Sequence, residues 1–293
     1  MSLLLPTASI LVMAFTVSSC NVFSLEQEGA ERNLQGDLES GGFPRTYQLH
    51  LPPEYEDKQL PVVIVLHGGG GSASGVRALT SFDGVADQWD FMAVYPDGWL
   101  GSWAEGCDCT NADTAGVDDV LFISELIDEL DADLGIDRSR VYAAGYSAGG
   151  FMMHKLACDL TDRLTAVASV AGTLPGPLAQ TCEPSRKMPF MMIHGTRDSV
   201  VPYEGVPDQG DFTLLSVDSS AQFWADANGC GERLPSVIEV GEFTAGTEVW
   251  FETWDCATDS EVILYRVVDG PHQWPTRSAF SASWEIARFF DSH

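Results

Sequence analysis

The chain has 293 residues, of which 45% are hydrophobic, and it carries 43 Asp and Glu against 15 Lys and Arg, a formal net charge of −28. This length and composition suit one domain with a full-sized core. The charge disfavours nucleic acid as a partner, because phosphate contacts need Lys and Arg. An acidic surface of this kind fits extracellular solubility and a saline habitat equally well.

The N-terminal segment indicates export. Residues 1–20 carry no charge and form a short apolar run interrupted by polar residues and Pro6, which predicts a secretory signal and not a permanent membrane span, although the usual opening Lys or Arg is missing. Its last four residues, VSSC, resemble a bacterial lipoprotein box in which Cys20 becomes lipidated; a plain signal peptide is the alternative. Residues 21–42 are polar and predict a flexible tether, and residues 43–293 predict the folded domain.

The cysteines agree with export, because exported proteins keep disulfides. Apart from Cys20 they form an even set of six. Two disulfides, Cys158–Cys182 and Cys230–Cys256, are favoured because each pair is close in sequence and flanked by turn residues. Cys107 and Cys109 can also pair locally, although the ring would be small and strained. Zinc is disfavoured, and no metal is expected, because no His lies at ligand spacing from the cysteines.

From residue 45 onward, apolar runs alternate with helical patterns. Such alternation predicts an α/β fold with a mostly parallel central sheet covered by helices on both faces. A half-exposed strand is expected first, then a series of buried strands rich in β-branched residues. These strands are expected at 45–51, 61–67, 91–96, 140–147, 166–172, 188–195 and 261–268. Apolar residues at helical spacing predict helices at 117–134, after residue 149, at 216–229 and at 281–290.

Gly145-Tyr146-Ser147-Ala148-Gly149 fits the G-x-S-x-G nucleophile elbow. The motif alone is weak, but here it follows a buried strand and precedes a predicted helix, which is the setting that it needs. The turn is so sharp that its flanking positions must lack Cβ atoms. Ser147 is therefore the candidate nucleophile.

A serine hydroxyl needs a base to take its proton. His272 follows the last predicted strand in a loop of turn residues, from which it can reach over the sheet, whereas His67 and His194 each end a buried strand and suit structural roles. Asp198 lies between Ser147 and His272 in chain order, beyond the strand at 188–195, where α/β sheets place their sites. We expect Asp198 to orient His272 and stabilise its imidazolium form.

The oxyanion of an acyl-transfer intermediate needs backbone donors. One is expected at Ala148, directly after the nucleophile, and the other in the glycine run after the strand at 61–67. Gly69 is the favoured donor there, with Gly68 and Gly70 as alternatives. A phosphate-binding loop is disfavoured, because the run lacks the Gly-Lys-Ser/Thr ending.

Seven segments together carry a family resemblance: LHGGGGSA, YPDGW, GVDDVLFI, RVYAAGYSAGGFMMHKLAC, HGTRDSVVPYEG, NGC and DGPHQWP. In this order, they resemble the secreted α/β-hydrolase esterases that include polyhydroxybutyrate depolymerases and feruloyl esterases. The resemblance runs from about Arg45 to the end and implies the site residues above, ester hydrolysis without a cofactor, and disulfides near Cys158 and Cys230. It departs at Pro271, where relatives often have Gly, and this stiffens the loop before His272.

The resemblance implies a serine esterase whose substrate is an ester, with feruloyl or related esters of plant cell-wall polysaccharide expected first. Polyester depolymerisation is the main alternative, and a peptidase or a non-catalytic surface protein is disfavoured. Trp99, Trp103 and Trp274 fall in loops expected to surround Ser147, where they can grip an aromatic or sugar group or simply pack the loops. The expected location is secreted or cell-surface.

Overall fold

The computed structural model describes residues 32–53, 55–56, 58–107, 109–207, 213–239, 248–277 and 280–293. The predicted signal at residues 1–20, the candidate lipidation site Cys20 and the tether up to residue 31 lie outside the described residues.

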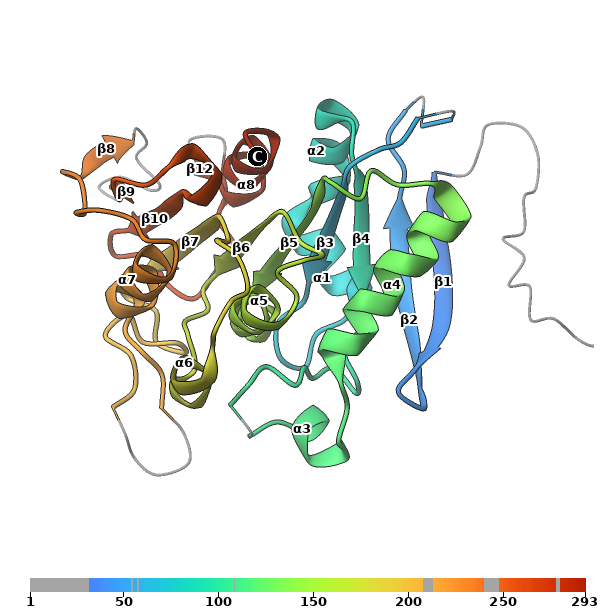
Figure 1. Cartoon of the computed structure of the whole chain (residues 1–293), viewed down its shortest axis with the longest axis horizontal. Coiled ribbons are helices and arrows are strands. Elements are labelled where there is room, and N and C mark those ends of the chain that lie inside the picture. The colour runs from blue at the N-terminus through green and yellow to red at the C-terminus, as the bar shows by residue number, and fades with distance from the viewer. Residues whose placement is uncertain are drawn as a thin grey trace, which may run out of the picture. The chain divides into compact units, whose positions relative to one another are not determined.

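In the described residues, ten strands form one sheet in the order β1-β2-β4-β3-β5-β6-β7-β10-β9-β8 (Figure 1). Its centre, from β4 to β10, is parallel, and antiparallel strands extend it at both ends. The strands are β1 (Asn33–Ser40), β2 (Phe43–His50), β3 (Val62–Leu66), β4 (Met92–Pro96), β5 (Val141–Tyr146), β6 (Ala166–Val170), β7 (Phe190–Gly195), β8 (Val237–Glu239), β9 (Val249–Thr253) and β10 (Val262–Val267). A separate pair consists of β11 (Thr276–Arg277) and β12 (Phe280–Ser281).

Helices cover both faces of the sheet. They are α1 (Ala73–Thr80), α2 (Phe82–Trp89), α3 (Asn111–Ala115), α4 (Asp119–Leu134), α5 (Ala148–Asp159), α6 (Gly176–Thr181), α7 (Val217–Ala227), α8 (Ala282–Asp291) and the short 3₁₀ helix η1 (Thr258–Ser260). Apolar residues of α4, α5, α6 and α7 share one core, and those of α1, α2 and α8 share the other. The predicted α/β-hydrolase fold, a mostly parallel sheet between two helical layers, is confirmed.

The central strands show why the two cores form. All five residues of β3 are buried, and they alternate between the two cores: Val62, Ile64 and Leu66 lie on one face, and Val63 and Val65 on the other. A strand sends successive side chains to opposite faces, so a strand buried on both faces must be apolar throughout. This is the pattern from which the buried strands were predicted.

Helix α4 agrees with its predicted range and has clear ends. The side chain of Asp118 accepts a hydrogen bond from the Leu121 amide at the N-terminus, and Gly135, with φ of 67°, ends the helix. Asp119 is buried and forms a 2.6 Å ion pair with the equally buried Arg45. This pair joins α4 to β2, because each charge would be costly to bury alone.

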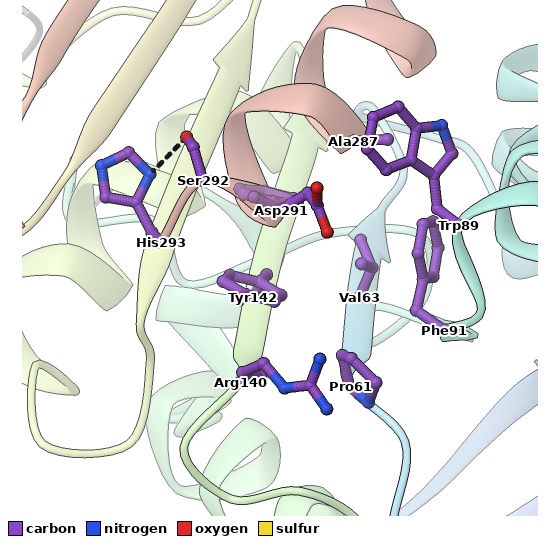
Figure 2. Close-up of a pocket in the computed structure, with 11 residues that line it drawn as sticks. Pro61, Val63, Trp89, Phe91, Arg140, Tyr142, Ala287, Asp291, Ser292 and His293 are labelled. Carbon is purple, nitrogen blue, oxygen red and sulfur yellow. Dashed lines mark hydrogen bonds between the residues drawn. The ribbon is translucent and has the colours of Figure 1, made fainter.

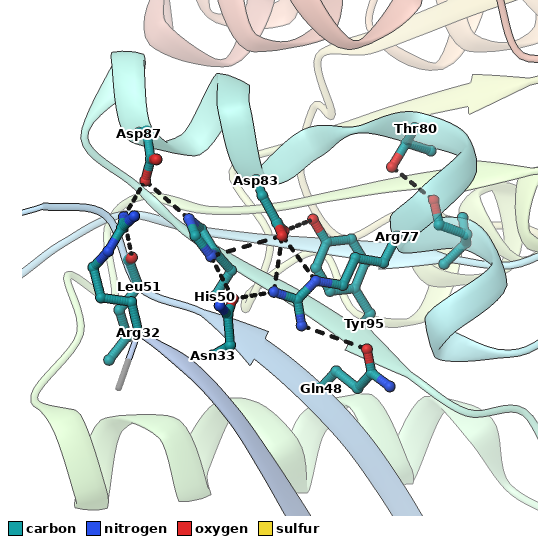
Figure 3. A network of polar contacts seen from close by, with 11 residues as sticks. Arg32, Asn33, Gln48, His50, Leu51, Arg77, Thr80, Asp83, Asp87 and Tyr95 are labelled. Atoms are coloured by element: carbon teal, nitrogen blue, oxygen red, sulfur yellow. Dashed lines mark hydrogen bonds and ion pairs between the residues drawn. The ribbon is translucent and has the colours of Figure 1, made fainter. Parts of the chain in front are cut away.

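The expectation of a tether reaching residue 42 is wrong for its last part. Residues 33–40 form β1, which pairs with β2 along its whole length. Exposure alternates along β1, and Leu34 and Leu38 pack against the core. Just before the strand, Arg32 forms a 2.6 Å ion pair with Asp87, which also accepts a hydrogen bond from His50 (Figure 3).

Three disulfides are present among the described cysteines: Cys158–Cys182, Cys230–Cys256 and Cys107–Cys109. The two favoured pairs and the local pair are thus all confirmed. None of the helices in the described ranges is both long and apolar enough to cross a membrane.

Candidate active site

The nucleophile elbow has the geometry that its sequence predicts. Ser147 joins β5 to α5 with φ of 55° and ψ of −115°, a conformation that is strained for a residue with a side chain. A Cβ at Gly145 would lie 2.1 Å from the carbonyl oxygen of Gly149, and one at Gly149 would lie 2.5 Å from that of Leu66. The Ser147 amide donates to the Val170 carbonyl at 2.9 Å, which fixes the turn to β6.

The three residues predicted to act together lie in hydrogen-bond contact. His272 Nε2 is 3.0 Å from Ser147 Oγ, and His272 Nδ1 is 2.7 Å from Asp198 Oδ2. With the Nδ1 proton donated to the carboxylate, Nε2 is free to accept the serine proton. Asp198 follows β7 and His272 follows β10, so both reach Ser147 from loops at the same edge of the sheet. Pro271 does not prevent His272 from reaching Ser147.

The environment of Asp198 keeps it ionised. Its Oδ1 accepts hydrogen bonds from the amides of Val200 and Val201 at 2.9 and 2.8 Å, and His194 Nε2 lies 3.4 Å from its Oδ2. Burial by itself raises the pKa of Asp198, but hydrogen bonds from His194, the two amides and His272 outweigh it and lower the pKa to about 2. A permanent carboxylate can therefore stabilise a positive charge on His272.

The glycine run after β3 lies beside the start of α5. A Cβ at Gly69 would be 3.8 Å from that of Ala148, which places this loop next to the residue after the nucleophile. The Gly70 amide is already used, because it donates to the Gly101 carbonyl at 2.8 Å. Within the described part of the chain, the amides of Gly69 and Ala148 have no such acceptor. Gly69 is therefore a better candidate than Gly70 for an oxyanion donor, and the Ala148 amide stays available as the other candidate donor.

We call the loops after β3 and β4 the oxyanion side, and the loops after β7 and β10 the relay side. His67 supports the oxyanion side: it is 1% exposed, its Nδ1 donates to the Gly68 carbonyl at 2.7 Å, and its Nε2 accepts from the Gly98 amide at 2.9 Å. Burial lowers the pKa of His67 and favours the neutral ring that this pattern needs.

His194 has the matching place on the relay side. It is fully buried, and its Nε2 donates to the Val201 carbonyl at 2.9 Å while facing Asp198. The structural roles predicted for His67 and His194 thus hold, but their contacts to the two sides of the site were not foreseen. The sequence signal is shared: each is a His at the end of a buried strand, followed by Gly.

Two of the three tryptophans expected to grip a substrate are in the wrong place for it. Trp103 and Trp274 are only 0% and 3% exposed, and their indole N–H groups donate to the His67 carbonyl and to Ser283 Oγ. They pack beneath the loops, because a large ring gains more from burial than from an open loop. Trp99 is half-buried, with its ring 4.8 Å from that of Phe43.

Glu105 is a buried carboxyl on the oxyanion side, 5% exposed, and its Oε2 has no hydrogen-bond partner among the described residues. Burial, together with repulsion from Asp113 and Asp119, raises its pKa to about 8. At neutral pH this side chain is therefore mostly protonated.

A cavity of about 250 Å³ lies elsewhere, against α8 and the starts of β3 and β5 (Figure 2). Pro61 and Arg140 line it, and they precede the strands whose other ends lead to Gly68 and Ser147. The cavity is thus at the opposite edge of the sheet from the three contacting side chains. Among the described residues, no group of three or more His, Cys, Asp and Glu is arranged to hold a metal ion.

Comparison with known proteins gives the family of the chain. The family model "Esterase PHB depolymerase" matches residues 45–182. "Putative esterase NocK" of Nocardia uniformis subsp. tsuyamanensis is 30% identical over 249 residues, which cover 80% of this chain and 72% of that protein. Feruloyl esterase C of Emericella nidulans is 29% identical over 254 residues, which cover 83% of each.

A solved structure supports the fold. The acetyl xylan esterase from Aspergillus awamori superposes with a TM-score of 0.63 and 13% sequence identity, over 89% of this chain and all of that one. The relatives named as esterases make the protein a carboxylic ester hydrolase. By sequence, the chain belongs to the esterase PHB depolymerase family of α/β-hydrolases.

Proposed function

We propose that the protein hydrolyses carboxylic esters through an acyl-enzyme, with Ser147 as nucleophile, His272 as general base and acid, and Asp198 as the residue that orients His272. The observation that carries the proposal is the continuous contact from Ser147 Oγ to His272 Nε2 at 3.0 Å and from His272 Nδ1 to Asp198 Oδ2 at 2.7 Å. These distances match the reach needed for proton transfer between a nucleophile, a base and its orienting acid.

In the first half of the reaction, Ser147 Oγ attacks the ester carbonyl carbon while its proton passes to His272 Nε2. The amides of Ala148 and Gly69 hold the negative carbonyl oxygen. His272 then returns the proton to the leaving alcohol, and the acyl group remains on Ser147. In the second half, His272 takes a proton from water, which attacks the acyl-enzyme; the acid leaves, and the proton returns to Ser147.

Feruloyl or related esters of plant cell-wall polysaccharide are the proposed substrates. Support comes from relatives: one is named a feruloyl esterase, and a protein of the same fold is named an acetyl xylan esterase. Half-buried Trp99 stays a candidate for contact with an aromatic or sugar group. Hydroxybutyrate oligomers remain the alternative substrate, in keeping with the name of the family.

Ser147→Ala provides the test. We expect kcat/KM to fall by about 10⁴–10⁶ on any ester that the wild type hydrolyses, because the serine and its partners act as one unit. Ser74→Ala, at an exposed serine on α1, is the control and should keep full activity. Feruloyl, acetyl and hydroxybutyrate oligomer esters, with a peptide amide as the contrast, distinguish the substrate classes. Unchanged ester hydrolysis in Ser147→Ala contradicts the proposal.

The N-terminal segment completes the proposal. Residues 1–20 act as an export signal that ends in a lipoprotein box, and Cys20 carries a lipid that anchors the protein. The three disulfides support an oxidising, extracellular location. Mass spectrometry of the protein from its membrane fraction tests the anchor: a diacylglycerol-modified Cys20 supports it, and a soluble mature protein lacking Cys20 contradicts it.

A further inference from the structure

The turn between Trp99 and Ser102 contains a residue that does not suit it. Trp99 and Ser102 pair as a β-bridge, and the two residues between them, Leu100 and Gly101, have φ of 49° and 75°. Two-residue turns with positive φ at both positions strongly prefer Asn-Gly or Asp-Gly. Gly101 fits this preference, but Leu100 is strained, because a residue with a bulky side chain rarely adopts positive φ.

The Leu100 side chain also gains nothing from packing. It is 78% exposed, the largest exposure among the exposed large hydrophobic residues of the described chain. A strained backbone and an apolar side chain in water both oppose folding. An observed outlier of this kind is grounds for a functional hypothesis.

The turn is held firmly against the oxyanion side. Gly70 donates its amide to the Gly101 carbonyl at 2.8 Å, and Gly98 donates its amide to His67 Nε2 at 2.9 Å. A Cβ at Gly101 would be 3.2 Å from the Cα of Gly70, so the two loops are in direct contact. Leu100 therefore projects from a rigid support that touches the residue next to Gly69.

Strand order gives the direction of Leu100 from the nucleophile. In the sequence of neighbours β4-β3-β5-β6-β7-β10, Ser147 follows β5, Leu100 follows β4 and His272 follows β10. Leu100 and His272 thus lie on opposite sides of Ser147. The leaving alcohol must lie on the His272 side, because His272 returns the proton to its oxygen. The acyl group is bonded to the same carbon and must point away from both the alcohol and the oxyanion, and the side of Leu100 is open to it because it lies away from His272.

We propose that Leu100 contacts the apolar part of the acyl group and thereby determines which acyl groups the enzyme prefers. This inference rests on the proposed function, since it assigns the two ends of the ester from the roles of Ser147 and His272. It predicts a preference for acids with an apolar chain or ring over acetic acid.

The test uses Leu100→Asn and 4-nitrophenyl acetate, butyrate and ferulate, which share one alcohol. For the butyrate and ferulate we expect kcat/KM to fall about tenfold, the size typical of a lost apolar contact. The acetate, whose acyl group has only one carbon beyond the carbonyl and so the least apolar surface to offer Leu100, should change less than about twofold. The melting temperature should rise by about 1–3 °C, because Asn-Gly suits this turn.

Leu79→Gln is the matched control, since Leu79 is also exposed (39%) but lies at the end of α1. It should leave the acyl preference unchanged. An unchanged butyrate-to-acetate ratio in Leu100→Asn, or an equal change in Leu79→Gln, overturns the inference while the proposed function stands. If Ser147→Ala retains wild-type activity, the proposed function fails and the inference fails with it.

Discussion

On the oxyanion side of Ser147 the groups proposed to hold the carbonyl oxygen are backbone amides, whereas on the relay side the groups proposed to move the proton are ionisable side chains. The Gly69 amide is positioned by the course of the backbone after β3, which His67 supports through hydrogen bonds to main-chain atoms, and the neighbouring Ala148 amide is positioned by the turn at Ser147. His272 and Asp198 are aimed by hydrogen bonds between side chains and by two amides. The oxyanion side therefore depends on backbone conformation, and the relay side depends on residue identity.

Asp198→Asn should have the largest effect on the relay side. An amide in place of the carboxylate permits the wrong His272 tautomer, so we expect kcat to fall about 10⁴-fold with the fold intact. Steady-state kinetics and circular dichroism check this prediction. A loss below tenfold would mean that Asp198 does not orient His272.

In the wild type, the Asp198 carboxylate should also stay ionised at acidic pH. With a pKa of about 2 in the folded protein, Asp198 stays ionised well below neutral pH. The stability that it contributes is present above its unfolded pKa, about 3.9, and is lost as the pH falls toward 2.

Gly69→Pro should have the next largest effect and tests the oxyanion side. Proline removes the amide hydrogen, so kcat is expected to fall by about 10²–10³. Gly69→Ala is the matched control: it keeps the amide, and its Cβ would meet the nearest atom at an ordinary 3.8 Å. Equal activity of the two variants would remove Gly69 from the oxyanion hole.

Glu105→Gln should have the smallest effect, a pH-dependent change in the free energy of unfolding. The folded protein holds the Glu105 proton more tightly than the unfolded chain, with a pKa of about 8 against 4.5. Its contribution to stability is therefore complete below about pH 4.5 and declines as the pH rises toward 8. The variant should be more stable than the wild type at pH 8, by about 1–3 kcal/mol, and the advantage should vanish at pH 4.

Urea unfolding at both pH values measures this difference. A constant difference between wild type and variant would show that Glu105 does not change its protonation on unfolding.

The two sides also differ in what the sequence reveals. The convergence of Ser147, Asp198 and His272 could be predicted because Ser147 lies in a recognisable motif, and Asp198 and His272 follow in the chain order that this motif requires, each in a loop after a buried strand. The sequence favoured Gly69 as the oxyanion donor but could not exclude Gly68 or Gly70, since adjacent glycines look alike; the hydrogen bond from the Gly70 amide to Gly101 is visible only in the structure. Leu100 gave no signal at all, because the sign of φ is not visible in a sequence.

The errors have a related cause. Trp103 and Trp274 were expected to face the substrate because they lie in loops, but a loop residue can point beneath its own loop as easily as outward. The strand β1 was mistaken for a tether because only Leu34 and Leu38 interrupt its polar residues. Its pairing with β2 supplies the backbone partners that composition does not reveal.

The register of β1 has a practical consequence. Asn33 lies opposite His50, which in turn lies opposite Ala93 near the start of β4, so the chain enters the sheet at the edge away from Ser147. A tag or solid support joined directly to Arg32 would therefore be attached at the edge of the sheet opposite Ser147. Immobilisation through that end should leave large, insoluble polymers free to approach.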